Sequence, residues 1–63
     1  MYQAGEKLIL VAHAAPTIGF AVGEEVEIMA VHPAVAVWPY MIRDKRGNIG
    51  YCGNENLGWE AQR

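Results

Sequence analysis

The stretch IGFAVGEEVEI, residues 18–28, is the part of this chain that best indicates its fold. A Gly-Glu turn stands between an apolar arm and a segment in which apolar and acidic residues alternate. Alternation with a period of two is typical of a strand with one buried face. The two faces predicted for this strand are Val26, Ile28 and Ala30 on one side and Glu25, Glu27 and Met29 on the other. The chain is therefore expected to reverse direction here and to enter a sheet.

Length and composition indicate one small domain. The chain has 63 residues, of which 52% are hydrophobic and 19% charged. This balance is typical of a folded chain and not of a disordered one. We expect a single domain over residues 1–63, with its core between about residues 5 and 60. No apolar run reaches the roughly 18–20 residues that span a bilayer, so we expect a soluble, cytoplasmic protein with no membrane partner.

The residues that usually carry catalysis or bind metals are few in this chain. The single cysteine, Cys52, excludes an internal disulfide and a zinc site built from cysteine pairs. His13 and His32 have no metal-ligand spacing relative to it, and no glycine-rich phosphate loop is present. We therefore expect no metal, no cofactor and no enzymatic activity. The net charge of −2 also counts against a nucleic acid as the main partner, because phosphate binding usually needs a basic surplus.

The rest of the chain reads as short strands separated by turns. Expected strands cover residues 7–14, 24–31, 40–43, 49–52 and 58–60, with loops at 15–22 and 32–39. Residues 44–48 predict a hairpin in which Gly47 supplies a positive φ, and residues 53–57 predict a single 3₁₀ turn. The predicted fold class is all-β: a small five-stranded antiparallel barrel with a 3₁₀ turn before the last strand.

Three segments together resemble the SH3 fold in its bacterial and phage versions. GFAVGEEVEI at 19–28 is similar to the family's diverging turn, and YMIRD at 40–44 with GNIGY at 47–51 is similar to its distal hairpin. CGNENL at 52–57 stands where the family has its last strand and 3₁₀ turn. The resemblance covers about residues 5–60 and implies an SH3-like barrel. The arrangement also resembles small phage and prophage proteins, which implies a protein that binds a host protein in the host cytoplasm.

The peptide groove of SH3 domains is expected not to be intact. Trp38 stands just before the third expected strand, where the family has its groove tryptophan. However, Gly53 occupies the position of the groove proline and Asn56 that of the following tyrosine. Recognition of proline-rich PxxP ligands, which bind in an extended conformation, is therefore not expected.

The function favoured by these observations is a non-catalytic protein–protein interaction module. Its expected surface combines aromatic and amide side chains with the loop at residues 13–20, because tyrosine and tryptophan are enriched at binding hot spots. The candidate binding residues are Trp38, Tyr40, Tyr51, Asn54, Asn56, His13 and Phe20. The structural alternatives are that Trp38 caps the barrel end and that Tyr40 belongs to the core. Trp59 is expected to pack at the barrel closure.

Two further readings stay open from the sequence. A nucleic-acid-binding barrel would use Arg43, Lys45 and Arg46, together with Lys7 and Arg63, as one basic face. A structural subunit of a larger assembly would self-associate. The apolar strip Ala34, Val35, Ala36 and Val37 offers such a contact, since an exposed apolar segment can add a strand to a partner or to a second copy.

Overall fold

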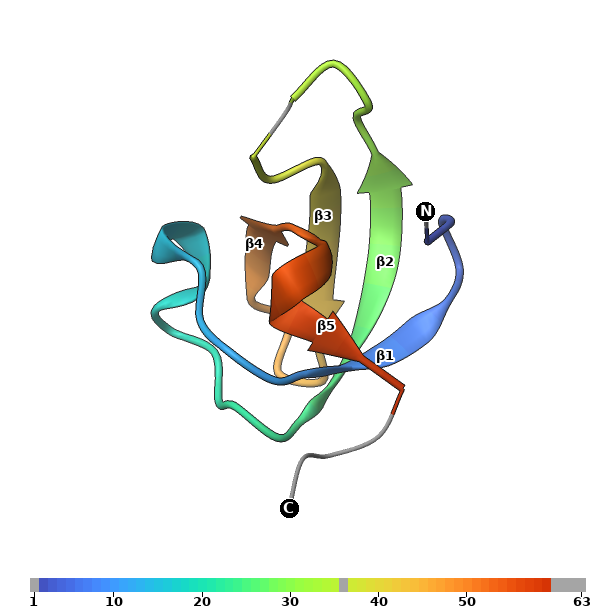
Figure 1. Ribbon diagram of the computed structural model, residues 1–63. Helices are drawn as coiled ribbons and strands as arrows, with labels where there is room; N and C mark the ends of the chain where they lie inside the picture. The colour runs from blue at the N-terminus through green and yellow to red at the C-terminus, as the bar shows by residue number, and fades with distance from the viewer. Residues whose placement is uncertain (1, 36, 60–63) are drawn as a thin grey trace.

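The computed structural model describes residues 2–35 and 37–59, and within them the chain forms five strands and two 3₁₀ turns (Figure 1). The elements are β1 (Lys7–Leu10), η1 (Ala15–Thr17), β2 (Glu25–Val31), β3 (Tyr40–Asp44), β4 (Ile49–Cys52), η2 (Asn54–Asn56) and β5 (Leu57–Gly58). All strand pairs are antiparallel, and the strand order is β4-β3-β2-β1-β5.

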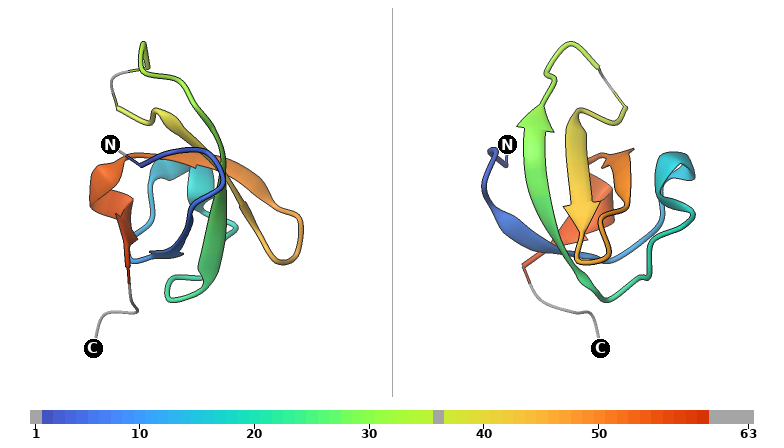
Figure 2. Two further views of the ribbon diagram at one scale, coloured as in Figure 1. Left: turned by 90° about the vertical axis from the view of Figure 1, so that its right-hand side faces the viewer. Right: turned by 180° about the vertical axis from the view of Figure 1, so that it is seen from behind.

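The five strands form one sheet that curls strongly on itself, so that η2 and β5 lie across its concave side (Figures 1 and 2). This half-barrel is compatible with an SH3-like fold. The expected all-β class, the five antiparallel strands and the 3₁₀ turn before the last strand are confirmed. Among the described residues, no helix has the length and apolar character needed to cross a membrane.

The core lies inside the curl of the sheet and is built from every second residue of the strands. β1, β2 and β3 each contribute two fully buried side chains, and burying one large apolar side chain contributes about 1.5–3 kcal/mol. The buried apolar side chains are Leu8, Leu10, Ala14, Phe20, Val26, Ile28, Tyr40, Ile42, Cys52 and Leu57. A core of this size gives a short chain only a small net stability. A single core substitution is therefore expected to remove a large fraction of the free energy of unfolding.

The expected alternation of β2 fails at one point. Val26 and Ile28 face the core as predicted, but the pairing with β3 shifts between Ile28 and Ala30. Beyond that bulge Ala30 pairs with Met41 on the outer face, and Val31 pairs with Tyr40 and packs against the core. The prediction that Ala30 lies on the same face as Val26 and Ile28 is therefore wrong, because one extra residue reverses which side the following residues face.

Two glycine turns join the strands as the sequence indicated. Gly23 in the turn before β2 has φ 96° and Gly47 in the β3–β4 hairpin has φ 87°, a region that L-residues with a side chain rarely adopt. The hairpin is further fixed by Asp44, whose carboxylate accepts hydrogen bonds from the backbone amides of Arg46 (3.0 Å) and Asn48 (2.9 Å) and from Asn48 Nδ2 (2.9 Å).

Two expected strand boundaries are corrected. The first strand ends at Leu10 and not at residue 14, because its partner β5 offers only Leu57 and Gly58 for pairing. Residues 15–17 then form η1, which Thr17 closes locally: its Oγ1 accepts from the Ala14 amide and donates to the Ala14 carbonyl, both at 2.9 Å. The last strand begins one residue earlier than expected, at Leu57; Glu60 lies outside the described residues.

Candidate functional site: an apolar hollow beside β4

An apolar hollow on the described surface joins three separate parts of the chain. Pro16 comes from η1, His32, Val35 and Trp38 from the loop between β2 and β3, and Tyr51 from β4. Its volume is about 370 Å³. No Asp, Glu, Lys or Arg is among these residues, so the hollow is uncharged whenever His32 is neutral.

The strand register brings Tyr51 to this surface. Tyr51 pairs with Met41 on the outer face of the β3–β4 hairpin, while its neighbour Cys52 pairs with Tyr40 inside. The Tyr51 hydroxyl donates to Met41 Sδ at 3.4 Å. The Tyr51 side chain remains 38% exposed and lines the hollow.

The β2–β3 loop positions the other wall. The His32 amide donates to the Pro39 carbonyl at 2.7 Å, and the Val35 amide donates to the His32 carbonyl at 2.9 Å. The imidazole lies 6.1 Å from the Tyr51 ring, centroid to centroid, at an interplanar angle of 43°. Trp38 is half-buried, packs against the core and also lines the hollow. Trp38 thus contacts both the core and the hollow, and its role in partner contact stays a prediction.

η1 reaches this wall because β4 carries a glycine. A β-carbon on Gly50 would lie 2.8 Å from the Pro16 carbonyl oxygen and 2.9 Å from Phe20 Cε1. Any side chain there would displace the segment that supplies Pro16. Phe20 itself is buried, with 5% of its surface exposed, so its predicted place on the binding surface is wrong. It is apolar and faces the sheet, which removes it from contact with a partner.

Tyr40 is likewise interior, with no exposed surface. Its hydroxyl donates to Asn54 Oδ1 at 2.7 Å and accepts from the Tyr2 amide at 3.0 Å. The Tyr2 ring lies 5.7 Å from the Tyr40 ring. The alternative that Tyr40 belongs to the core is therefore correct, and its predicted surface role is wrong. Asn54 is exposed, but its side-chain oxygen serves this internal network.

Asn56 is also structural, because it is 5% exposed and both ends of its amide are used. Oδ1 accepts from the Gly53 amide at 3.0 Å, and Nδ2 donates to the Ala12 carbonyl at 3.1 Å. It thus fastens η2 to the chain beyond β1, and its predicted surface role is wrong. His13 is exposed, yet it lies outside the hollow, with Nε2 2.7 Å from the Phe20 carbonyl oxygen.

The predicted surface is therefore brought together only in part, at Trp38 and Tyr51. Pro16, from the loop at residues 13–20 that was expected to join the surface, and Val35, from the apolar strip expected as a second contact, complete it together with His32, which was not predicted as a binding residue. Val35 lies in the apolar strip at 34–37, whose described members Ala34, Val35 and Val37 are exposed in a loop and not in a strand. Ala36 lies outside the described residues. Trp59 is 68% exposed and touches Tyr2 edge-on at 5.5 Å, so it closes less of the core than expected.

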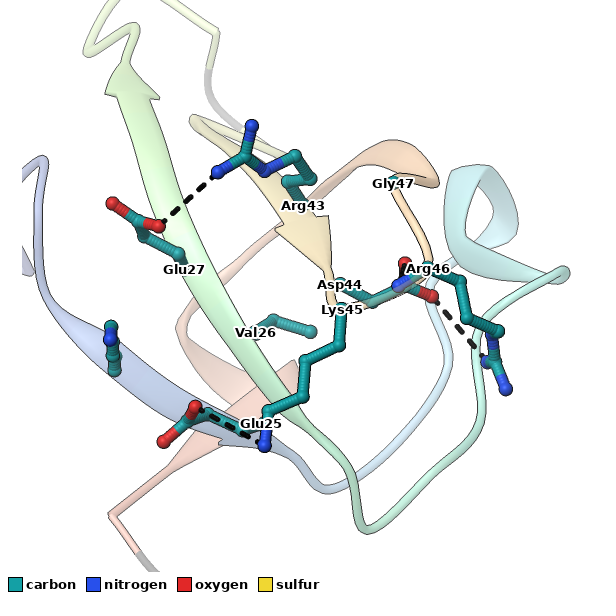
Figure 3. A pocket seen from close by; sticks show the side chains of 9 residues that line it. Glu25, Val26, Glu27, Arg43, Asp44, Lys45, Arg46 and Gly47 are labelled. Atoms are coloured by element: carbon teal, nitrogen blue, oxygen red, sulfur yellow. Dashed lines mark hydrogen bonds and ion pairs between the residues drawn. The ribbon is translucent and has the colours of Figure 1, made fainter.

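A second hollow, of about 410 Å³, lies on the charged outer face of β1, β2 and β3 (Figure 3). Three of its basic side chains are paired with acidic ones. Arg43 lies 3.6 Å from Glu27, and Lys45 lies 3.8 Å from Glu25. Arg46 contacts Glu24 at 3.1 Å and Asp44 at 3.4 Å. Lys7 lines the same hollow, whereas Arg63 lies outside the described residues. Basic and acidic groups are interleaved here, so these residues do not form one basic face.

The Cys52 thiol and the metal-ligand residue types singled out in the sequence can both be placed in the structure. Cys52 is fully buried; burial first, and then the negative charge of Glu55, raise the pKa of its thiol to about 12. A thiol held protonated in this way is a poor nucleophile. Within residues 2–35 and 37–59, no three His, Cys, Asp or Glu side chains gather as a metal site would require.

Fold and surface together define a small all-β half-barrel with an apolar hollow beside β4 and a charge-balanced face on β1, β2 and β3. Comparisons with protein-family models, with curated proteins and with solved structures return no match.

Proposed function

We propose that this chain is a non-catalytic, SH3-like protein-interaction module that binds its partner in the hollow formed by Pro16, His32, Val35, Trp38 and Tyr51. The observation that carries the proposal is the convergence of Trp38 and Tyr51 with three other residues into an uncharged hollow. Tryptophan and tyrosine combine a large apolar area with one polar tip, which is why they dominate binding hot spots.

The chemistry of the hollow argues for one kind of occupant. Burying an apolar side chain against an uncharged lining is favourable, whereas a charged side chain would lose its hydration without gaining an oppositely charged group. We therefore infer that the occupant is an extended segment of a partner protein that places an uncharged apolar side chain between Trp38 and Tyr51.

The mode of binding differs from PxxP recognition. At the position where the SH3 groove has its proline, a β-carbon on Gly53 would lie 2.6 Å from the Val37 carbonyl oxygen. Asn56, at the position of the groove tyrosine, is buried. Both facts support a site centred on Trp38, Tyr51 and the β2–β3 loop, without the second half of the groove.

Charge pairing gives less support to the nucleic-acid alternative. Arg43, Lys45 and Arg46 each form an ion pair with a carboxylate. A nucleic-acid phosphate would have to replace that carboxylate and would also be repelled by its negative charge. The structural-subunit alternative would use the exposed strip around Val35 and Val37. The resemblance to phage proteins favours a host protein as the partner and the host cytoplasm as the place of action.

A peptide-display selection tests the proposed site. Random peptides are selected on the wild-type protein at pH 8, and the best binder is synthesised and titrated against variants. Trp38→Ala should raise its dissociation constant by about thirtyfold, as loss of a hot spot does. Trp59→Ala, which removes the same ring outside the hollow, should change it less than twofold.

A second variant guards against loss of folding, since Trp38 also packs on the core. Val35→Lys places a charge in the hollow at an exposed position and should abolish peptide binding while the circular dichroism spectrum stays that of the wild type. Selected peptides that bind all these variants equally well would show that the hollow is not the binding site.

A further inference from the structure

We infer that His32 makes binding in this hollow depend on pH, so that the partner segment is held tightly only while the imidazole is neutral. The inference rests on the proposed function and adds a means of regulation to the same site. It is carried by the position of His32, which is the one histidine that lines the hollow.

The imidazole forms part of the wall and does not merely lie near it. It is tilted against the Tyr51 ring at a centroid distance of 6.1 Å. The backbone of His32 is fixed by two hydrogen bonds: its amide donates to the Pro39 carbonyl, and its carbonyl accepts from the Val35 amide. The side chain is exposed in the free protein. A segment seated between Trp38 and Tyr51 would therefore cover it and remove water from it.

The lining of the hollow offers no opposite charge to compensate a charge on the imidazole. η1 presents Pro16 to the hollow, the β2–β3 loop presents Val35 and Trp38, and β4 presents Tyr51. Tyr51 is the other titratable group of the lining, and its hydroxyl proton points to Met41 Sδ. Among the described residues, no carboxylate lines the hollow and none of the ion pairs includes His32.

The direction of the effect follows from desolvation. Covering a charged imidazolium with an apolar side chain costs free energy, whereas covering a neutral imidazole costs much less. Histidine side chains change charge between about pH 5 and 8. Binding is therefore strong above this range and weakens as pH falls through it. A tenfold preference of the bound state for the neutral form corresponds to about tenfold weaker binding at low pH.

The test uses the peptide selected at pH 8, with blocked termini and without His, Asp, Glu or Cys, so that the probe itself does not titrate. Its dissociation constant is measured at pH 8.0 and pH 5.0 for the wild type, His32→Gln and His13→Gln. The wild type and His13→Gln should bind about tenfold more weakly at pH 5.0. His32→Gln should bind equally at both pH values, and unfolding curves at both confirm that each variant is folded.

Each outcome decides the matter. Trp38-dependent binding that is independent of pH, or that keeps its pH dependence in His32→Gln, overturns the role of His32 while the proposed function stands. Peptide binding that does not depend on Trp38 overturns the proposed function and this inference together. Loss of the pH dependence in His32→Gln alone supports both.

Discussion

Gly50 and Pro16 approach each other so closely that a β-carbon on Gly50 would lie 2.8 Å from the Pro16 carbonyl oxygen. The contact seats η1 against β4, and it brings Pro16 to the hollow that Tyr51 borders from the other side. A single glycine in a strand thus couples the stability of the half-barrel to the shape of its candidate binding site.

Gly50→Ala should therefore lower both the free energy of unfolding and peptide binding. We expect a loss of about 1–3 kcal/mol, as overpacking at a backbone contact costs, because the carbonyl and Phe20 must move together. Gly19→Ala is the matched control: a β-carbon there would meet nothing within 4 Å, so its stability should lie within about 0.5 kcal/mol of the wild type. Urea unfolding measures the stability of both variants, and equal stabilities for Gly50→Ala and Gly19→Ala would contradict the account of this contact.

Tyr40→Phe should destabilise the protein without changing its core volume. The change removes the hydroxyl that donates to Asn54 and accepts from the Tyr2 amide, at a cost of about 1–2 kcal/mol. Tyr51→Phe removes a hydroxyl from a partly exposed ring and should cost less than about 0.5 kcal/mol. Thermal unfolding compares the two, and a larger loss for Tyr51→Phe would be the contrary result.

Acid should weaken the β3–β4 hairpin through Asp44. Burial by itself raises the pKa of this carboxyl, but hydrogen bonds from Asn48 and from the Arg46 amide, together with the Arg46 charge, outweigh it and hold the pKa below the ordinary 3.8. A carboxyl group whose pKa is lowered by folding contributes its full stabilisation above its ordinary pKa. This stabilisation is lost as the pH falls through the pKa of the folded state. Unfolding free energies of the wild type should therefore fall in that window below pH 4.

Asp44→Asn should remove this part of the pH dependence, while Glu25→Gln, at the partly exposed Lys45 pair, should retain it. Denaturant unfolding between pH 2 and 6 measures all three proteins. A curve for Asp44→Asn as steep as that of the wild type would assign the acid sensitivity to other carboxyls.

Cys52 should be unreactive in the folded protein. With its thiol pKa raised to about 12 and its side chain buried, it should react with a disulfide reagent at pH 8 only as fast as the chain unfolds. The thiol should react at once in denaturant. Rapid stoichiometric labelling of the native protein would mean that β4 opens at its edge.

Local patterns explain what could be predicted from the sequence. The strands ending at Val31 and Cys52, and the positive φ of Gly47, follow from alternation and from the turn chemistry of glycine. The bulge between Ile28 and Ala30 could not be found in this way, because the alternation of apolar residues continues through it. It depends on which residues of β3 pair with β2.

The binding surface depended on contacts that are distant in sequence. Tyr40 and Tyr51 are both strand tyrosines, and only their register places one inside, opposite Cys52, and the other outside, opposite Met41. Pro16, His32 and Val35 carry no common motif and meet Trp38 only because η1 and the β2–β3 loop converge beside β4. Trp38 and the apolar strip at 34–37 were the signals that pointed to this loop.

The most direct test of the central claim is an amide chemical-shift map of the wild-type protein titrated with the selected peptide. We predict that the largest changes cluster at residues 32, 35, 38 and 51, with residue 17 reporting on the neighbouring Pro16, which has no amide proton. Shifts concentrated instead at Lys7, Glu27 and Arg43, on the charged face of β1, β2 and β3, would contradict the assignment of the hollow as the binding site.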